Sequence, residues 1–432
     1  MIAATRLGCR GSETAMGSRL RENAHPQMRF AFQELSALRL GQVPFLSIRC
    51  SGSECVSRGP WINQKPSEII AARRTERKGP PGFPAHLMRL PMVTRSWWSD
   101  AVIDIEWEHP LHQRGVASGV AVTSGHVIVH ERSTRLVSLD PADGAVRWDV
   151  PIGTWPRAVA VVGDRCLVIP QNNPRLSCLD LATGREIWTA HVPATPGHLV
   201  VSANVVLVGG WRGYTPLRAF DLATGRLRWE TEQRIRTVLP VPAGDGFLIG
   251  VPGDIRGRLI DRHDGRVRAA WRLPQPLVDN DAGSSIAEVG PGRFLLRCGR
   301  RALAEIDLSS DTAREFVQAE TDLVAAAPEQ AGGLLWLPEP RGYTVVDPAA
   351  GRLLWRVDVG ERLVGQVFPT ADGFLIAGTS GVLFHLTSDG RLANRTRVAR
   401  RIWALRSAAP DRLFAVAKGS LIAIAVRNSA CS

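Results

Sequence analysis

The chain has 432 residues, with 53 Lys or Arg against 41 Asp or Glu and a formal net charge of +12. Residues 1–96 hold 15 of the basic and 6 of the acidic residues, so residues 97–432 are nearly balanced, which argues against a nucleic-acid-binding surface there. No run of eighteen apolar residues occurs, and the sequence therefore predicts no membrane-spanning helix.

Residues 1–96 carry no repeat and are interrupted by Pro and Gly, as at Gly79–Gly82. Three interpretations fit: the segment is disordered, which we favour; translation starts at Met88 or Met92 instead; or the segment is a basic arm with a partner. Only Met28–Leu40 could form a short amphipathic helix. Because the chain lacks the apolar core of a secretory signal, we expect a cytoplasmic protein, unless a wrongly assigned start hides another address.

Beyond this segment, one short phrase returns about every 40 residues, with its aspartates at Asp140, Asp180, Asp221, Asp261, Asp307 and Asp347. It reads LVSLDPADGAVRW at Leu136–Trp148. The phrase predicts a strand, a tight turn and a second strand, because the Asp side chain can bond turn N–H groups and Gly accepts a positive φ. With another apolar hairpin upstream, each unit has four short strands, which is typical of a β-propeller blade.

The phrase resembles the tryptophan-docking repeat of the PQQ-like (pyrroloquinoline-quinone-type) β-propeller family, whose consensus is roughly Ala-x-Asp-x-x-Thr-Gly-x-x-x-Trp. Leu179–Trp188 and Ala219–Trp229 match it best, and the resemblance extends from Trp107 to the C-terminus. It implies that each Trp packs against the neighbouring blade at the outer rim. The residues expected to dock the blades are Asp140, Gly144, Trp148, Asp180, Gly184, Trp188, Asp221, Gly225, Trp229, Asp347, Gly351, Trp355 and Trp107.

The spacing also predicts how the ring closes. Trp107 stands 41 residues before Trp148 and belongs to an outermost strand that has no blade of its own before it. The last hairpin and strand, which end with Leu421–Val426, lack an outer strand. We therefore expect Val102–Trp107 to pair beside Leu421–Val426, which removes two exposed sheet edges and gives eight blades, with seven as the alternative.

Some copies of the phrase are degenerate, and we expect looser rims in those blades. After Asp261 the Trp has moved to Trp271, and the next copy has Asp311 where Gly is expected and Phe316 near the Trp position. The copy at Thr387 has no Trp. The sequence thus predicts an all-β protein with two parts, an N-terminal extension over residues 1–96 and a PQQ-like propeller over residues 97–432.

The cysteines do not suggest a disulfide framework in so long a chain. Cys166 and Cys178 lie on adjacent strands of one hairpin and could face each other, although two reduced core cysteines are the favoured interpretation. Cys298 is expected in the core, and Cys50 and Cys55 have no second pair to complete a zinc site.

The resemblance also raises the question of a quinoprotein dehydrogenase. Enzymes of the family carry adjacent cysteines beside the quinone and longer pocket-forming insertions, and this chain has no Cys–Cys pair. The one acidic cluster resembling a calcium loop, Asp279–Gly283, lacks a distal Glu at the required spacing. We therefore expect the non-enzymatic branch of the family, with no catalytic residue, no metal, and neither PQQ nor calcium as cofactor.

A partner would bind through loops. With strands lettered A (inner) to D (outer), the Asp turns join C to D, and the links from D to the next A leave the opposite face. Candidate ligand residues on those links are Arg114, Trp155, Arg157, Arg234, Arg236, Arg362, Arg401 and Trp403, beside His198, Asp279, Asp281, Glu320, Asp322 and Arg400. Arginine forks suit carboxylates, although the abundance of Arg, at 50 against 3 Lys, would produce the same pattern without a site.

The preferred function is a monomeric, non-catalytic scaffold that binds a protein or peptide, or another anionic ligand, through this loop face and the channel mouth. The alternatives are a quinone-dependent oxidoreductase and a propeller of the outer-membrane barrel-assembly type.

Overall fold

The computed structural model describes residues 102–112, 120–131, 134–153, 156–170, 173–193, 197–279, 284–409 and 411–427. The predictions for residues 1–96, including the helix at Met28–Leu40 and the two cysteines Cys50 and Cys55, lie outside these ranges. Among the candidate ligand residues, Arg114, Trp155 and Asp281 also lie outside them.

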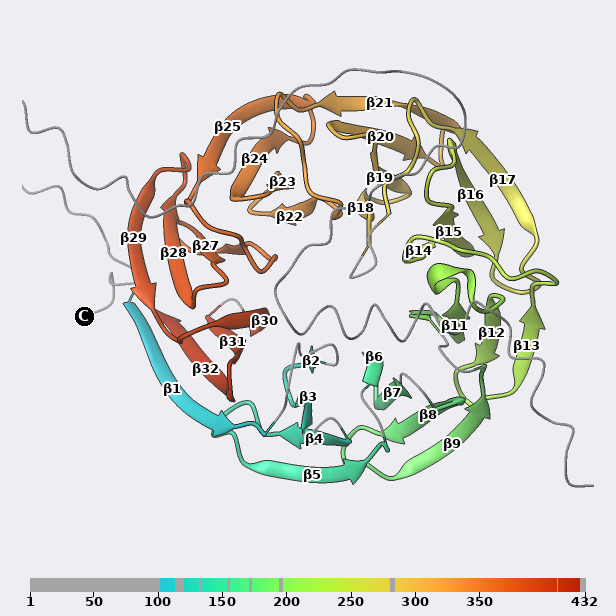
Figure 1. Cartoon of the computed structure of the whole chain (residues 1–432), viewed down its shortest axis with the longest axis horizontal. Coiled ribbons are helices and arrows are strands. Elements are labelled where there is room, and N and C mark those ends of the chain that lie inside the picture. The colour runs from blue at the N-terminus through green and yellow to red at the C-terminus, as the bar shows by residue number, and fades with distance from the viewer. Residues whose placement is uncertain are drawn as a thin grey trace, which may run out of the picture. The chain divides into compact units, whose positions relative to one another are not determined.

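In the described residues, eight four-stranded antiparallel sheets are arranged in a ring, as the sequence predicts (Figure 1). Blade 1 consists of β2 (Val120–Val122), β3 (Val127–Glu131), β4 (Arg135–Leu139) and β5 (Val146–Pro151). Blade 2 consists of β6 (Pro156–Val162), β7 (Arg165–Pro170), β8 (Arg175–Asp180) and β9 (Glu186–His191). Blade 3 consists of β10 (His198–Ser202), β11 (Val205–Gly209), β12 (Arg218–Asp221) and β13 (Leu227–Glu230). Blade 4 consists of β14 (Val241–Ala243), β15 (Gly246–Gly250), β16 (Arg256–Asp261) and β17 (Val267–Arg272).

The remaining blades continue in the same order around the ring. Blade 5 consists of β18 (Ile286–Gly290), β19 (Arg293–Cys298), β20 (Ala302–Asp307) and β21 (Thr312–Gln318). Blade 6 consists of β22 (Glu329–Ala331), β23 (Leu334–Glu339), β24 (Gly342–Asp347) and β25 (Arg352–Asp358). Blade 7 consists of β26 (Phe368–Pro369), β27 (Gly373–Ala377), β28 (Val382–Thr387) and β29 (Leu392–Arg397). Blade 8 consists of β30 (Ile402–Ala409), β31 (Arg412–Ala417), β32 (Ser420–Arg427) and β1 (Val102–Pro110).

Blade 8 closes the ring with strands from distant parts of the chain. Its outer strand is β1, which pairs antiparallel with β32, so that Val102 lies opposite Arg427 and Trp107 opposite Ala423. The predicted closure and the count of eight blades are therefore confirmed, and the seven-bladed alternative is wrong. Pairing β1 with β32 hides the strand edge that each would otherwise expose.

The repeated turn has the expected geometry. In blade 1, Asp140 Oδ1 accepts a hydrogen bond of 2.8 Å from the N–H of Ala142, and the N–H of Gly144 donates to the carbonyl of Asp140. Gly144 has φ 73°, which is the left-handed region that glycine adopts without a Cβ clash. The turn brings the C and D strands together on one face of the ring.

Every outer strand carries a β-bulge that the sequence analysis did not foresee. In blade 1, Ser138 lies opposite Trp148 and Leu139 opposite Val146, so Arg147 is the extra residue. One extra residue moves the side chains that follow it to the opposite face of the sheet and increases the local twist of the strand. The Trp therefore points to the neighbouring blade, and Arg147 turns back to bind Asp140 at 2.7 Å.

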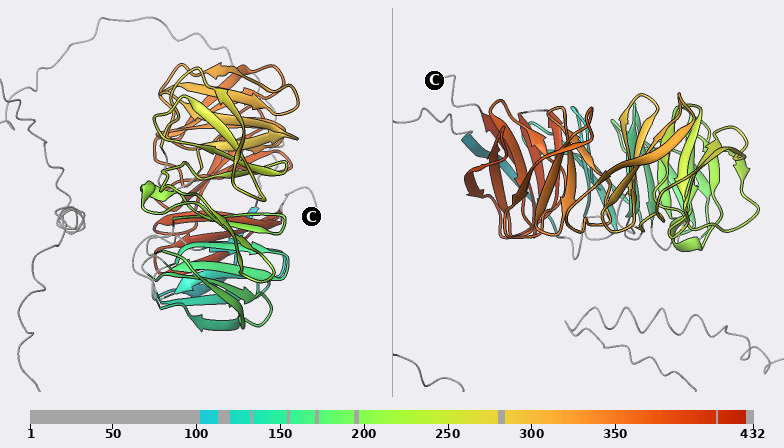
Figure 2. Two further views of the ribbon diagram at one scale, coloured as in Figure 1. Left: turned by 90° about the vertical axis from the view of Figure 1, so that its right-hand side faces the viewer. Right: turned by 90° about the horizontal axis from the view of Figure 1, so that it is seen from above.

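The core lies between the blades. One cluster joins Ile128 and Leu136 of blade 1 to Val168 and Leu179 of blade 2, and equivalent clusters follow around the ring. Seen edge-on, the strands cross the thickness of the ring and the loops lie on its two faces (Figure 2). Within the described residues, no helix is long and apolar enough to cross a membrane.

The two hairpin cysteines do not face each other. Cys166 lies opposite Leu179 and Cys178 opposite Leu167, so their positions are offset by one residue. Cys166 packs in the cluster between blades 1 and 2, whereas Cys178 packs in the cluster between blades 2 and 3. Both are buried and unpaired, which confirms the interpretation as reduced core cysteines, and Cys298 is buried as well.

Candidate interaction surface

Tryptophans of the outer strands lie over the turns of the next blade. A Cβ added to Gly184 would come within 2.8 Å of the Trp148 ring, and the same overlap occurs between Trp107 and Gly144. Four of these indole N–H groups also donate to a backbone carbonyl of that turn: Trp107 to Pro141 at 3.0 Å, Trp148 to Leu181 at 2.8 Å, Trp188 to Leu222 at 3.0 Å and Trp229 to Arg262 at 2.9 Å. Glycine is thus required at this position for two reasons: the backbone has a positive φ, and the tryptophan ring occupies the space that a Cβ would need.

The degenerate copies keep part of this contact. Trp271 donates its indole N–H to Asp311 Oδ1 at 2.8 Å, and Asp311 adopts φ 54° in place of Gly. Phe316 lies against Gly351, whose turn is held by Asp347 through the N–H of Ala349 at 2.9 Å. The blade 4–5 contact therefore replaces a carbonyl acceptor with a carboxylate, which the sequence analysis did not anticipate.

The last copy is the weakest. The ring of Trp355 occupies the space above Gly390. In β29 of blade 7, Asn394 stands where β5, β9, β13 and β25 carry the docking Trp, and it is exposed. No aromatic side chain of β29 therefore covers the junction between blades 7 and 8, where β1 is the next outer strand.

The opposite face carries the links from D to A and from B to C. Arg236, on the link after blade 3, forms an ion pair with Asp279, on the link after blade 4. On the next link, Asp322 binds both Arg300 and Arg301. The structure thus places three of the predicted residues, Arg236, Asp279 and Asp322, in ion pairs on this face.

Asp279 is consequently held by a guanidinium group, while Asn280–Gly283 lie outside the described residues. In the part of the chain that the structure describes, no three His, Cys, Asp or Glu side chains come together in a way that could hold a metal ion.

Other predicted ligand residues have different surroundings. Arg234, Arg362 and Arg401 are exposed on this face. Trp403 packs instead against the core between blades 8 and 1, so it adds little stacking surface. His198, which was predicted to lie on a link, begins β10 instead and is buried, and its Nε2 lies 3.1 Å from the carbonyl of Thr237.

One cluster on this face was missed. The link between β11 and β12 contains the short helix η1 (Trp211–Gly213), which the sequence analysis overlooked because it considered only the D-to-A links. The guanidinium carbon of Arg157 lies 4.1 Å from the centre of the Trp211 ring, and that of Arg212 lies 4.8 Å from it. The available signal was the run WRGY, which follows Gly209 and Gly210 in an unusually long link.

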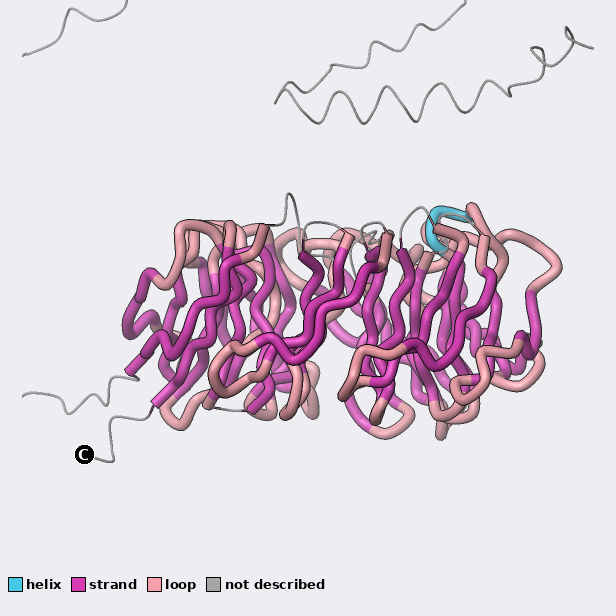
Figure 3. Tube along the Cα trace, turned by 90° about the horizontal axis from the view of Figure 1, so that it is seen from below, coloured by secondary structure: helices cyan, strands magenta, loops and turns pink. Residues whose placement is uncertain are grey.

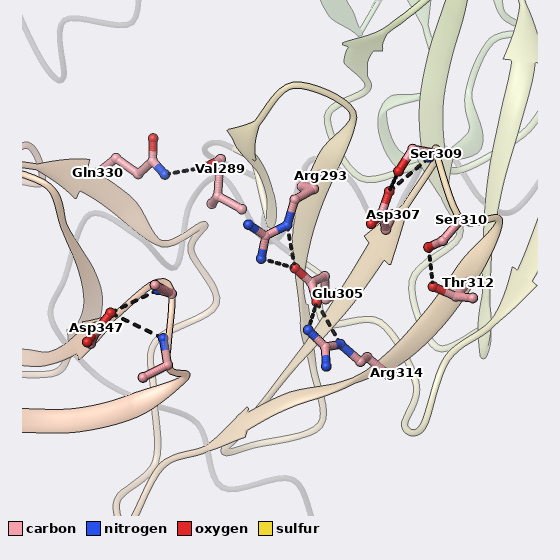
Figure 4. Close-up of polar contacts among 12 residues, drawn as sticks. Val289, Arg293, Glu305, Asp307, Ser309, Ser310, Thr312, Arg314, Gln330 and Asp347 are labelled. Atoms are coloured by element: carbon pink, nitrogen blue, oxygen red, sulfur yellow. Dashed lines mark hydrogen bonds and ion pairs between the residues drawn. The ribbon is translucent and has the colours of Figure 1, made fainter.

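Buried carboxylates elsewhere in the ring are already bound. In blade 5, Arg293 Nε donates to Glu305 at 2.9 Å and Arg314 Nε at 2.7 Å (Figure 4). In blade 6, Glu339 binds Arg356 at 2.6 Å. Since each carboxylate is held by guanidinium groups, neither is available as a general base.

A third carboxylate, which is half-buried, lies on the innermost strand of blade 6. Glu329 accepts hydrogen bonds from the N–H groups of Gln366, at 2.7 Å, and Val367, at 2.8 Å. Burial raises the pKa of this carboxyl above its ordinary value, against the effect of those two hydrogen bonds. Gln366 has φ 66°, so Glu329 fixes a strained turn beside the inner strands.

A family model described as "Outer membrane protein assembly factor BamB" matches residues 103–174 and 172–320. The chain belongs to this family of PQQ-like propeller repeats. The outer membrane protein assembly factor BamB of Yersinia pestis is 24% identical over 300 residues, which cover 65% of this chain and 71% of that protein. Both matches agree with the resemblance that the Asp–Gly–Trp phrase indicated.

Solved structures show the same fold. BamB from Moraxella catarrhalis is similar with a TM-score of 0.61 and 15% identity, covering 75% of this chain and all of that one. The computationally designed Ika8 protein has a TM-score of 0.59 at 12% identity, covering 74% of this chain and 98% of its own. Sqt1 of Saccharomyces cerevisiae has a TM-score of 0.60 at 7% identity, with the same two coverages. At such identities the likeness is one of fold alone.

The expected cytoplasmic location is wrong. The family description and the Yersinia relative both name an assembly factor of outer membrane proteins. The expectation rested on the lack of an apolar leader in the sequence, and such a lack carries no positive information about where a protein acts.

Proposed function

We propose that the protein is a non-catalytic scaffold that binds a protein partner during outer membrane protein assembly, through the face that carries the D-to-A links. The observation that carries this proposal is the ion pair between Arg236 and Asp279, which ties the links of two neighbouring blades together. Links that are held in place before binding lose less conformational entropy when a partner arrives. The ring below them is a rigid support of eight packed sheets.

The chemistry of the side chains supports a binding role without turnover. The buried carboxylates Glu305 and Glu339 are held by arginines. A histidine–serine pair among the described residues, His126 Nδ1 and Ser138 Oγ at 2.9 Å, is buried, where a substrate cannot reach it. We therefore propose that the protein works as a monomer without PQQ or calcium, and that its partner presents anionic groups to the exposed arginines.

Site-specific photo-crosslinking tests the scaffold. A photoreactive residue at Arg234, on the proposed binding face, should crosslink to outer membrane assembly proteins in an envelope fraction. The same residue at Arg226, on the turn at the opposite face of blade 3, should not. Arg236→Asp should weaken the Arg234 crosslink, and the exchanged pair Arg236→Asp with Asp279→Arg should restore it. Equal crosslinking from both faces would refute the proposed surface.

The proposed lack of a cofactor has its own test. Added PQQ and calcium should leave the thermal unfolding midpoint of the full-length protein unchanged, because a ligand that binds only the folded state raises that midpoint. Dehydrogenase turnover under the same conditions would refute the non-catalytic proposal.

A further inference from the structure

The cluster around Trp211 stands out on the proposed binding face. The helix η1 lies on that face, in the link between the second and third strands of blade 3 (Figure 3). Trp211 contacts two guanidinium groups, from Arg157 at 4.1 Å and from Arg212 at 4.8 Å. Tyr214 packs edge-on against Trp211, with ring centres 5.8 Å apart, and is itself 48% exposed. The link thus presents an aromatic and cationic platform to solvent.

The backbone of this link is strained. Gly209, Gly210 and Gly213 all have positive φ, and so does Arg212 at 52°, where a side chain other than glycine is disfavoured. The indole N–H of Trp211 is buried and has no hydrogen-bond acceptor. A buried donor without a partner costs stability, and strain of this kind gathers at functional sites. Both features mark this link as a strained part of the face.

The platform is continuous with the ion pair described above. A Cβ added to Gly213 would lie 3.5 Å from the Cβ of Arg236, the residue that binds Asp279. Arg157 belongs to blade 2, Trp211 to blade 3, and Asp279 to the link after blade 4. The surface therefore extends across three blades on one face.

The charges of this surface favour one class of ligand. Arg212 and Tyr214 are exposed and could hold a carboxylate and an adjoining apolar group. Nucleic acid also stacks on aromatic rings, but its phosphate backbone would meet Asp279 and Asp322 on the same face. An acidic peptide avoids that repulsion, since its carboxylates are spaced apart and can contact the arginines without approaching the aspartates.

We propose that Trp211, Arg212 and Tyr214 bind an acidic segment of a partner protein, with a carboxylate held by Arg212 beside the Trp211 ring. This deepens the proposed function, on which it rests, by naming the chemistry of the partner and the part of the face that recognises it. Arg157 packs on the Trp211 ring and acts as a positioning residue.

A peptide titration of the full-length protein tests this assignment. The probes are a fluorescein-labelled decapeptide GEPEGGEPEG, its glutamine counterpart GQPQGGQPQG and the oligonucleotide dT12. The acidic peptide should bind at least about tenfold more tightly than the glutamine peptide, as expected for a charge-assisted hydrogen bond. Arg212→Asn, which keeps a residue that tolerates positive φ, should weaken binding of the acidic peptide about tenfold. The matched control Arg226→Asn, at an exposed turn on the opposite face, should not change it.

Tryptophan indole NMR follows the contact itself. With ¹⁵N-labelled tryptophan, the Trp211 signal is the one that disappears in Trp211→Phe, and the acidic peptide should shift it while the glutamine peptide should not. Equal binding of the two peptides, tighter binding of dT12, or equal behaviour of Arg212→Asn and Arg226→Asn would overturn the proposal.

The outcomes also separate this inference from the proposed function. If Arg234 still crosslinks to assembly proteins while Arg212→Asn has no effect on peptide binding, the scaffold stands and the platform is refuted. If no position on the face crosslinks but the acidic peptide binds at Trp211, the platform stands and the scaffold is refuted.

Discussion

The stability that comes from the contact between an outer-strand tryptophan and the glycine of the next blade can be measured by adding one methyl group to that glycine. In Gly184→Ala, the added Cβ would overlap the ring of Trp148 at 2.8 Å, and φ at that position is +71°. Gly163, in another turn of the same blade, has φ +57° and nothing within 4 Å of an added Cβ. Gly163→Ala therefore carries the backbone strain without the overlap, and serves as the control.

The expected magnitudes follow from these geometries. Both variants place alanine in the left-handed region, which costs about 1–2 kcal/mol. Gly184→Ala must also displace Trp148, which is only 7% exposed and donates to the Leu181 carbonyl at 2.8 Å. Losing that hydrogen bond costs about 1 kcal/mol, and partial loss of the packing adds about 2 kcal/mol, less than full truncation of a buried aromatic. We expect Gly184→Ala to be about 3 kcal/mol less stable than Gly163→Ala.

Urea unfolding followed by circular dichroism measures this difference, from the shift of the midpoint multiplied by the slope m. The wild-type protein and both variants should show a single transition with the same m, so that midpoints can be compared. Equal losses of stability in the two variants would refute the idea that the tryptophan contact stabilises the blade junction.

Three further predictions concern single side chains. Asp311→Ala should lower the free energy of unfolding by about 2 kcal/mol, because it removes the acceptor of the Trp271 indole N–H and leaves alanine at a positive φ. Asp311→Asn retains an acceptor, so its loss of free energy in the same urea assay should be less than half as large. The pKa of Asp221 is lowered to about 2 by its hydrogen bond to Arg228. The unfolded state therefore takes up the proton first, and the contribution of Asp221 to the free energy of unfolding should be lost as pH falls from about 4 through 2. The urea midpoint of Asp221→Asn should vary less with pH over that range than the wild-type midpoint, and an equal variation would contradict the assignment. Burial raises the pKa of the Cys166 thiol to about 12, so mass spectrometry after brief iodoacetamide treatment of the native protein should find Cys166 unmodified; alkylation without unfolding would refute its burial.

The repeat spacing predicted the fold because the propeller repeats one local rule. Asp140 and Gly144 fix a turn within five residues, and the same pattern recurs at a constant period. The 41-residue step from Trp107 to Trp148 identified β1 as a displaced outer strand, which the pairing with β32 confirms. Periodicity of this kind needs no knowledge of long-range contacts.

The sequence could not place side chains that depend on contacts between blades. In the sequence, Asp311 in place of glycine suggests that the turn is lost. In the structure, Asp311 instead accepts a hydrogen bond from the indole N–H of Trp271. The bulge before the tryptophan affects the sequence only through the number of residues between Asp and Trp, and it could not be recognised from that spacing alone. Trp211 lies in a link whose length varies between blades, so periodicity gave no reason to examine it.

The pairing of β1 with β32 has a consequence for the order of folding. Val102 and Arg427 are partners although they are 325 positions apart in the chain. Closing a flexible loop of that length costs roughly 5 kcal/mol of chain entropy, against about 2 kcal/mol for a hairpin of ten residues. Seven blades can form from local hairpins during synthesis, but β1 has no partner until the last strand is made. We therefore expect closure of blade 8 to be the slowest step, and the open edge of β32 to be the point at which an unfinished ring associates with other chains.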